Sequence, residues 1–171
     1  MNPTQNLILV GPMGSGKSAV GRALARELHR DFFDSDHVIE ERTGVDIAYI
    51  FEKEGEEGFR LRESRILEEL TGKAGIVLAT GGGAVVRDEN RRCLRSRGFV
   101  IYLQTSVNQQ LKRTNRGRER PLLNEADDRR KRLEALLQDR EPKYLEIADL
   151  IVGTDGRKVQ AVAADILGQL P

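Results

Sequence analysis

The sequence contains no tryptophan, a single cysteine and no long apolar run, and these absences exclude several classes of protein. Aromatic residues make up 5% of the chain, which leaves little surface for stacking on nucleic-acid bases. Cys93 has no second cysteine with which to form an internal disulfide or a cysteine-based zinc site. The apolar run Leu7–Val10 is too short for a signal-peptide core, and no later run is long enough to span a bilayer. We therefore expect a cytoplasmic protein with no membrane partner.

An excess of charge of either sign is also lacking, because 28 Lys and Arg residues face 27 Asp and Glu residues, for a net charge of +1. This balance gives no electrostatic reason to expect nucleic acid as a partner. The length of 171 residues suits one domain with its own hydrophobic core. No long exposed apolar stripe favours an obligate oligomer, so we expect a monomer.

Short apolar segments alternate with longer amphipathic ones along the chain, which is typical of an α/β fold. Five apolar runs predict buried strands, at residues 7–10, 32–33, 76–79, 99–103 and 150–152. Helices between and after these runs predict a parallel sheet that is covered on both faces. Ligands of such sheets bind at the carboxyl ends of the strands. Two segments, about 34–70 and about 113–124, are predicted to leave this core.

The residues GPMGSGKS at 11–18 match the phosphate-binding pattern G-x-x-x-x-G-K-[ST] and stand between a predicted strand and a predicted helix. Glycines allow backbone N–H groups to face phosphate oxygens, and the helix N-terminus adds the positive end of its dipole. Lys17 is expected to contact the β- and γ-phosphates of a nucleoside triphosphate, and the Ser18 hydroxyl to bind Mg²⁺. The predicted triphosphate-binding residues are Gly14, Ser15, Gly16, Lys17, Ser18 and Ala19.

The same loop also fits a dinucleotide-binding fingerprint, G-x-G-x-x-[GA], with Asp36 lying 20 residues after Gly16 as the ribose-binding acid. The length of the loop argues against this alternative. Five residues separate the predicted strand from Gly16, whereas a dinucleotide turn is tighter and has no use for a Lys-Ser pair at the helix start.

No carboxylate follows the third predicted strand, where many phosphate-loop proteins place an Asp that holds Mg²⁺. Asp34 and Asp36 follow the second strand instead, and side chains two apart in an extended segment share a face. We therefore expect one carboxylate to serve the metal and the other to serve the acceptor of the phosphoryl group. The alternative is that Ser35 or Asp36 only caps a helix that starts near His37.

The third strand runs instead into Gly81, Gly82 and Gly83. Three glycines cost conformational entropy, so the run suits backbone that lies directly against a ligand. The alternative is a flexible loop.

Two arginines lie on the apolar faces of predicted helices, where an arginine requires an anionic partner. Arg140 continues an apolar stripe, and Pro142 after it predicts that the helix ends or kinks there. Arg60 precedes Glu63 by three positions, a spacing at which the carboxylate can orient the guanidinium. Two such arginines predict an acceptor with a carboxylate or phosphate, and internal salt bridges are the alternative.

These motifs together resemble those of the shikimate kinase family, over residues 7 to about 151. The phosphate loop is shared by many families, but the others are more specific: DSD at 34–36, GEEGFR at 55–60, TGGG at 80–83, RPLL at 120–123 and R-x-P-x-Y at 140–144. The resemblance implies transfer of a phosphoryl group from ATP to the 3-hydroxyl of shikimate with Mg²⁺. It also implies a three-layer α/β/α fold whose five parallel strands have the order 2-3-1-4-5, with an acceptor-binding region at about 34–70 and a lid at about 113–124.

The resemblance assigns roles to the acceptor residues by position. Asp34 helps to hold Mg²⁺, Asp36 contacts the acceptor hydroxyls as the candidate base, Arg60 and Arg140 pair with the carboxylate, and the Gly82 backbone approaches the ring. The implied substrate-binding residues are Asp36, Phe51, Phe59, Arg60, Glu63, Gly81, Gly82, Gly83 and Arg140.

Four arginines fall in the predicted lid, at 113, 116, 118 and 120, and phosphoryl transfer benefits from a mobile cation near the γ-phosphate. The resemblance places Arg120 against the transferred phosphate and Arg113 against the adenine. The expected catalytic residues are therefore Lys17, Asp36 and Arg120.

Other functions are compatible with the phosphate loop alone. A kinase for gluconate or a nucleoside monophosphate shares this build, and the family-specific motifs argue against both. A nucleotide-dependent switch would need an N-K-x-D motif and a D-x-x-G after the third strand, and the sequence contains neither.

Overall fold

Five apolar segments form one fully parallel sheet in the computed structural model, which describes residues 1–114 and 123–171 and the side chains of 1–114 and 127–171. Strand β1 lies in the centre, and Leu7 aligns with Val77 on one side and with Phe99 on the other. The order confirms the predicted 2-3-1-4-5 arrangement. From one edge to the other the strands are β2 (Phe32–Asp34), β3 (Val77–Ala79), β1 (Asn6–Val10), β4 (Gly98–Gln104) and β5 (Leu150–Gly153).

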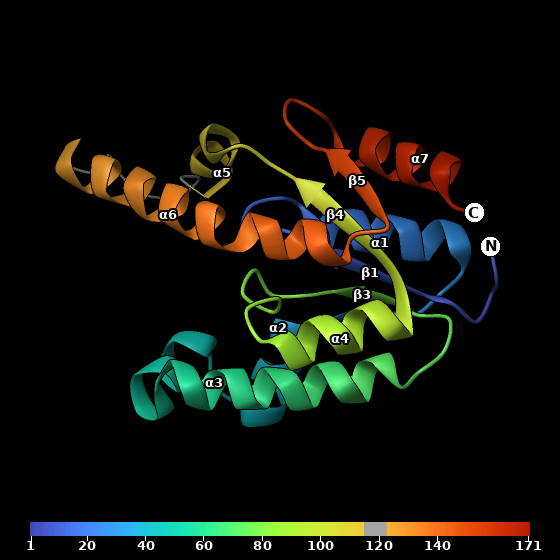
Figure 1. Ribbon diagram of the computed structural model, residues 1–171, viewed down its shortest axis with the longest axis horizontal. Coiled ribbons are helices and arrows are strands. Elements are labelled where there is room, and N and C mark those ends of the chain that lie inside the picture. The colour runs from blue at the N-terminus through green and yellow to red at the C-terminus, as the bar shows by residue number, and fades with distance from the viewer. Residues whose placement is uncertain (115–122) are drawn as a thin grey trace.

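Seven helices cover the two faces of this sheet in the part of the chain that the structure describes (Figure 1). Alternate residues of a strand point to opposite faces, so Leu7 and Leu9 pack with α1 and α7, whereas Ile8 and Val10 pack with α2, α3, α4 and α6. The helices are α1 (Lys17–Leu28), α2 (Ser35–Thr43), α3 (Ile47–Thr71), α4 (Asp88–Arg97), α5 (Val107–Thr114), α6 (Leu123–Ile147) and α7 (Val159–Gln169). The three-layer α/β/α expectation is therefore confirmed.

The DSD segment is not extended, which corrects one expectation. Only Asp34 belongs to a strand, and Asp36 lies in the first turn of α2. Asp34 caps the helix, because its Oδ1 accepts from the backbone N–H groups of Asp36 at 3.0 Å and His37 at 3.2 Å. These N–H groups have no partner within the helix, so a carboxylate just before it stabilises the start. The idea that Ser35 or Asp36 caps the helix is wrong.

Two helices depart from simple expectations. Helix α6 does not end near Pro142 but continues through it to Ile147. Helix α3 contains a break at Gly55, whose φ of 73° and ψ of 179° are not helical and favour glycine. Phe51 and Phe59 lie on either side of this break, and their ring centroids are 4.9 Å apart.

Asn6 holds the end of the sheet that lies away from the phosphate loop. Its side chain is buried, and Nδ2 lies within hydrogen-bonding distance of the carbonyl oxygens of Thr71, Lys73 and Arg97, at 3.3, 2.8 and 3.2 Å. Its Oδ1 accepts from the backbone N–H of Ile76 at 3.0 Å. One side chain thus joins the ends of α3 and α4 to the start of β3.

We predict that Asn6→Ala lowers the free energy of unfolding by about 3 kcal/mol and the melting temperature by roughly 6–12 °C, because it leaves several buried backbone groups without partners. Thermal unfolding followed by circular dichroism measures both. Gln5→Ala is the matched control, since the Gln5 side chain makes no hydrogen bond within residues 1–114 and 127–171. Equal melting temperatures for the two variants would contradict the role of Asn6.

Candidate active site

The phosphate loop wraps around the ammonium group of Lys17. Positive φ angles at Gly11, Gly14 and Gly16 (152°, 80° and 89°) turn the backbone between β1 and α1. The Lys17 Nζ donates to the carbonyl oxygens of Gly11 at 2.7 Å and Pro12 at 2.9 Å. Burial lowers the pKa of Lys17 to about 8, although the negative charges of Asp36 and Asp34 act to raise it.

The hydroxyl of Ser18 donates to Asp34 Oδ2 at 2.5 Å, so the loop after β1 and the corner after β2 are directly joined. Asp34 uses its other oxygen to cap α2. The two predicted metal ligands are therefore adjacent. The described residues contain no cluster of three or more His, Cys, Asp or Glu side chains that would hold a metal by themselves.

Asp36 lies at the bottom of the acceptor side of the site. Its Oδ1 is buried without a hydrogen-bond partner among the described side chains. A Cβ atom on Gly81 would lie 2.6 Å from this oxygen, so only glycine leaves room for the carboxylate. The Gly81 N–H donates to Ser35 Oγ at 3.2 Å, which fixes the glycine run beside α2.

The pKa of Asp36 is raised to about 6. Burial is the main cause, and the negative charges of Glu63 and Asp34 add to it. The positive charges of Lys17 and Arg60 oppose the shift. A carboxyl group with this pKa changes its protonation state close to neutral pH, as a general base must.

Arg60 and Glu63 form a buried ion pair, with Nη1 and Oε1 2.9 Å apart, which confirms the predicted contact. Glu63 is completely buried and Arg60 is 8% exposed. Each keeps one buried atom without a hydrogen-bond partner in the described part of the chain, Arg60 Nε and Glu63 Oε2. Arg60 Nε lies 3.5 Å from Glu56 Oε1 in a second, longer ion pair. The guanidinium leaves no space for a side chain at position 83, because a Cβ there would lie 2.6 Å from Arg60 Cζ.

Arg140 reaches the same cleft from α6, and its Nε is also buried without a hydrogen-bond partner among the described side chains. Gly82 lies between Arg140 and the phosphate loop: a Cβ on it would lie 3.7 Å from Arg140 Nη1 and 3.4 Å from the Met13 N. The structure therefore brings both inward arginines together. The resulting cleft of about 730 Å³ is lined by, among others, Lys17, Ser18, Asp34, Asp36, Phe51, Phe59, Arg60, Glu63, Gly81, Gly82, Gly83 and Arg140.

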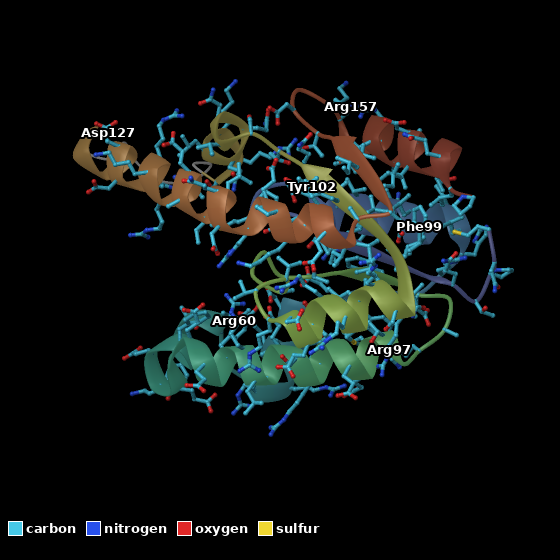
Figure 2. All side chains as sticks on the ribbon, in the orientation of Figure 1. Arg60, Arg97, Phe99, Tyr102, Asp127 and Arg157 are labelled. Atoms are coloured by element: carbon cyan, nitrogen blue, oxygen red, sulfur yellow. The ribbon has the colours of Figure 1, made fainter. Side chains whose placement is uncertain are left out.

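A second cleft, of about 1000 Å³, lies on the other side of the phosphate loop and is lined by Ser15, Gly16, Ala19, Arg113 and Thr154 among others. Arg113 donates to the carbonyl oxygens of Gly14 at 2.8 Å and Thr154 at 3.2 Å, so it joins this cleft to the loop. Figure 2 shows the separation of the two sides, with Arg60 on α3 in one half of the molecule and Arg157 near β5 in the other. Gly16, Ala19 and Arg22 line both clefts.

Some site residues fall outside the structure or were missed from the sequence. Arg120 lies outside the described residues. From the sequence Ser35 was considered only as a helix cap, whereas its Oγ accepts from the Gly81 N–H. No contact was predicted for Gln110, whose Nε2 donates to the Met13 carbonyl at 2.9 Å, or for Tyr144, whose hydroxyl donates to the Gly82 carbonyl. Tyr144 ends the R-x-P-x-Y motif, but its partner lies 62 positions away and no local pattern shows such a contact.

The phosphate loop, the 2-3-1-4-5 sheet and a charged acceptor cleft define the class of phosphate-loop kinases. A solved gluconokinase from Sinorhizobium meliloti has the same fold, with a TM-score of 0.62 at 16% identity over 98% of this chain and 92% of its own. At that identity the likeness shows the fold alone. No described helix is long and apolar enough to cross a membrane.

The chain belongs to the shikimate kinase family, because residues 13–171 match the family model described as "Shikimate kinase". It is 55% identical over 170 residues to a shikimate kinase of Vibrio cholerae serotype O1, across 99% of this chain and 97% of the relative. A solved shikimate kinase from Acinetobacter baumannii, in complex with shikimate, superposes with a TM-score of 0.89 at 47% identity, over 98% of this chain and 96% of that chain.

We predict that the Asp36 carboxyl titrates near pH 6 in the free protein and that Lys17→Met raises its pKa further, because the substitution removes a positive charge that favours the ionised form. Carbon NMR of labelled aspartate measures both values. Lys53→Met is the control, since Lys53 is exposed and lies over the Tyr49 ring. A lower pKa in the Lys17 variant would contradict the arrangement of charges.

Proposed function

We propose that this chain transfers the γ-phosphoryl group of ATP to the 3-hydroxyl of shikimate, giving shikimate 3-phosphate and ADP, a step toward chorismate and the aromatic amino acids. One observation carries the proposal. Buried polar atoms without hydrogen-bond partners among the described side chains, on Asp36, Arg60, Glu63 and Arg140, belong to residues that line one cleft beside the phosphate loop. A small acceptor with a carboxylate and several hydroxyls supplies the partners that these atoms lack.

The donor half of the site consists of the phosphate loop and Asp34. Lys17, which now bonds two carbonyl oxygens, gains charge-assisted bonds when phosphate oxygens replace them. Mg²⁺ prefers hard oxygen ligands, and the adjacent oxygens of Ser18 and Asp34 fit that preference, so we assign these two residues to the metal. When bound, Mg²⁺ neutralises charge on the phosphates. Arg113 borders the cleft that we assign to adenine.

The acceptor half positions a hydroxyl against the donor. Arg60 and Arg140 bind the carboxylate of shikimate, and Glu63 holds Arg60 in place through their 2.9 Å contact. Asp36 accepts the proton of the 3-hydroxyl as that oxygen bonds to the γ-phosphorus, while the bond from this phosphorus to the bridging oxygen breaks and the oxygen leaves with ADP. Gly82 brings backbone against the ring. Most of the rate enhancement then comes from positioning and charge neutralisation.

The remaining assignments complete the proposal. Phe51 and Phe59 form the apolar wall of the acceptor cleft. The segment at about 34–70 is the acceptor-binding region, and that at about 113–124 is the lid. The lid carries Arg120 to the transferred phosphate and excludes water on closing. We also propose that the protein acts as a monomer, because the sequence shows no long exposed apolar stripe of the kind that favours an obligate oligomer.

The proposed reaction is tested by shikimate-dependent release of ADP with Mg-ATP. We expect turnover with shikimate and none with gluconate or nucleoside monophosphates. The methyl ester of shikimate keeps every hydroxyl but lacks the carboxylate charge, so we expect its KM to rise by about 100-fold, as for loss of a pair of charge-assisted contacts. Folded protein that shows no shikimate-dependent ADP release would exclude the function, and an ester with an unchanged KM would exclude the arginine assignment.

We predict that Asp36→Asn lowers kcat by about 100-fold or more, while the Kd of ATP changes less than about twofold. The wild-type kcat/KM for shikimate falls below pH 6, because protonated Asp36 cannot accept a proton, and the kcat/KM for ATP falls above pH 8, because neutral Lys17 no longer attracts phosphate. The residual activity of the variant lacks the acid limb. Asp128→Asn, a change at an exposed carboxylate of α6, is the control and leaves kcat and both limbs unchanged. Normal turnover in Asp36→Asn would remove this residue from the mechanism.

A further inference from the structure

Two buried tyrosines stack on each other near the acceptor cleft, and only one of their hydroxyls bonds to a residue that lines it. Tyr102 on β4 and Tyr144 on α6 are 0% and 1% exposed, and their ring centroids are 5.0 Å apart. The Tyr102 hydroxyl donates to Glu141 Oε2 at 2.9 Å, away from the glycine run. The Tyr144 hydroxyl donates to the carbonyl oxygen of Gly82. The two side chains are therefore alike in burial and stacking but differ in what the hydroxyl holds.

The bond to Gly82 fixes the orientation of a peptide group that glycines leave free to rotate. Peptides between glycines turn with little steric resistance, because no Cβ opposes rotation. The chain has no cis peptide bond in its described part, and a trans peptide directs its C=O and the following N–H to opposite sides. With the Gly82 carbonyl held by Tyr144, the N–H of Gly83 points away from Tyr144.

Two backbone N–H groups of the glycine run have no described partner when this peptide is fixed. The Gly81 N–H is taken by Ser35, whereas the N–H groups of Gly82 and Gly83 have no hydrogen-bond partner within the residues that the structure describes. Both glycines line the acceptor cleft. A polar oxygen of the acceptor would supply the partner that these N–H groups lack, because backbone donors that a bound ligand shields from water are costly to leave unpaired.

The same turn of α6 supplies the carboxylate-binding arginine. Tyr144 follows Arg140 by four positions, which places both on one face of the helix. The Nη1 of Arg140 lies 3.7 Å from the point where a Cβ of Gly82 would stand. One helical face thus holds the acceptor's carboxylate and the backbone against which its ring lies.

We propose that Tyr144 is a positioning residue for the acceptor: its hydroxyl keeps the Gly82 carbonyl out of the cleft and so leaves the N–H of Gly83 available to the acceptor. The proposal rests on the proposed function for the identity of the acceptor. It adds a residue that does not itself contact the reacting atoms.

The test compares Tyr144→Phe with Tyr102→Phe. Each removes one oxygen from a buried, stacked ring, so a loss of packing alone affects both variants alike. The Tyr144 hydroxyl also lies beside Arg140, so a readout at the glycine run itself is needed as well. We expect Tyr144→Phe to raise the KM and Kd of shikimate about five- to tenfold, as for loss of one hydrogen bond, with the KM of ATP within twofold of the wild type. Tyr102→Phe leaves all three unchanged. An equal rise in the shikimate KM of both variants, or no rise in Tyr144→Phe, would overturn the proposal.

Amide hydrogen exchange gives a second readout that does not depend on activity. The Ala84 N–H donates to the Gly81 carbonyl and the Val86 N–H to the Gly83 carbonyl, both at 3.1 Å, so these two amides report on the order of the glycine run. We expect faster exchange at both in Tyr144→Phe and wild-type rates in Tyr102→Phe. Wild-type rates in Tyr144→Phe would contradict the proposal. A wild-type protein that does not phosphorylate shikimate would instead remove the proposed function and leave this comparison valid.

Discussion

The hydrogen bond between Ser18 and Asp34 determines how the rest of the site is built. Ser18 follows β1 and Asp34 ends β2, yet the sheet order places β3 between these two strands. Their side chains therefore meet above the carboxyl end of β3, in the space where the chain leaving that strand would carry its own side chains. After Thr80 that chain consists of three glycines, and a Cβ on Gly81 would lie 2.6 Å from Asp36 Oδ1. The glycine run thus reflects the charged groups packed against it, with the Asp36 carboxylate beside Gly81 and the Arg60 guanidinium beside Gly83.

Burial of several charges in one cleft narrows the difference between the pKa values of Lys17 and Asp36. Lys17 falls to about 8 and Asp36 rises to about 6, each mainly through loss of solvent. The same burial leaves polar atoms of Arg60 and Arg140 without hydrogen-bond partners among the described side chains. Such an arrangement lowers the stability of the empty protein, and binding of an anionic acceptor offsets that loss.

The sequence was sufficient to predict those parts that depend on local pattern. The five strands, the phosphate loop and the Arg60–Glu63 pair follow from periodicity and spacing, and the strand order came from the family resemblance. The placement of Asp36 in the site was predicted on a wrong premise. The prediction took 34–36 as extended, whereas Asp34 caps a helix that begins at Ser35 and contains Asp36. Contacts of Tyr144 with Gly82, and of Asn6 with three carbonyl oxygens, join residues more than 60 positions apart. Such contacts depend on how the layers pack, which no local pattern encodes.

The two clefts share Gly16, Ala19 and Arg22 as a common border at the start of α1. A single compound with one group for each cleft, joined by a short linker across this border, would bind its second group at an effective concentration in the millimolar range. Its affinity would then exceed that of either group alone without any new contact. This shared border makes the protein suited to inhibition by such bivalent ligands. The acceptor group would direct them away from kinases whose acceptor cleft lacks paired arginines.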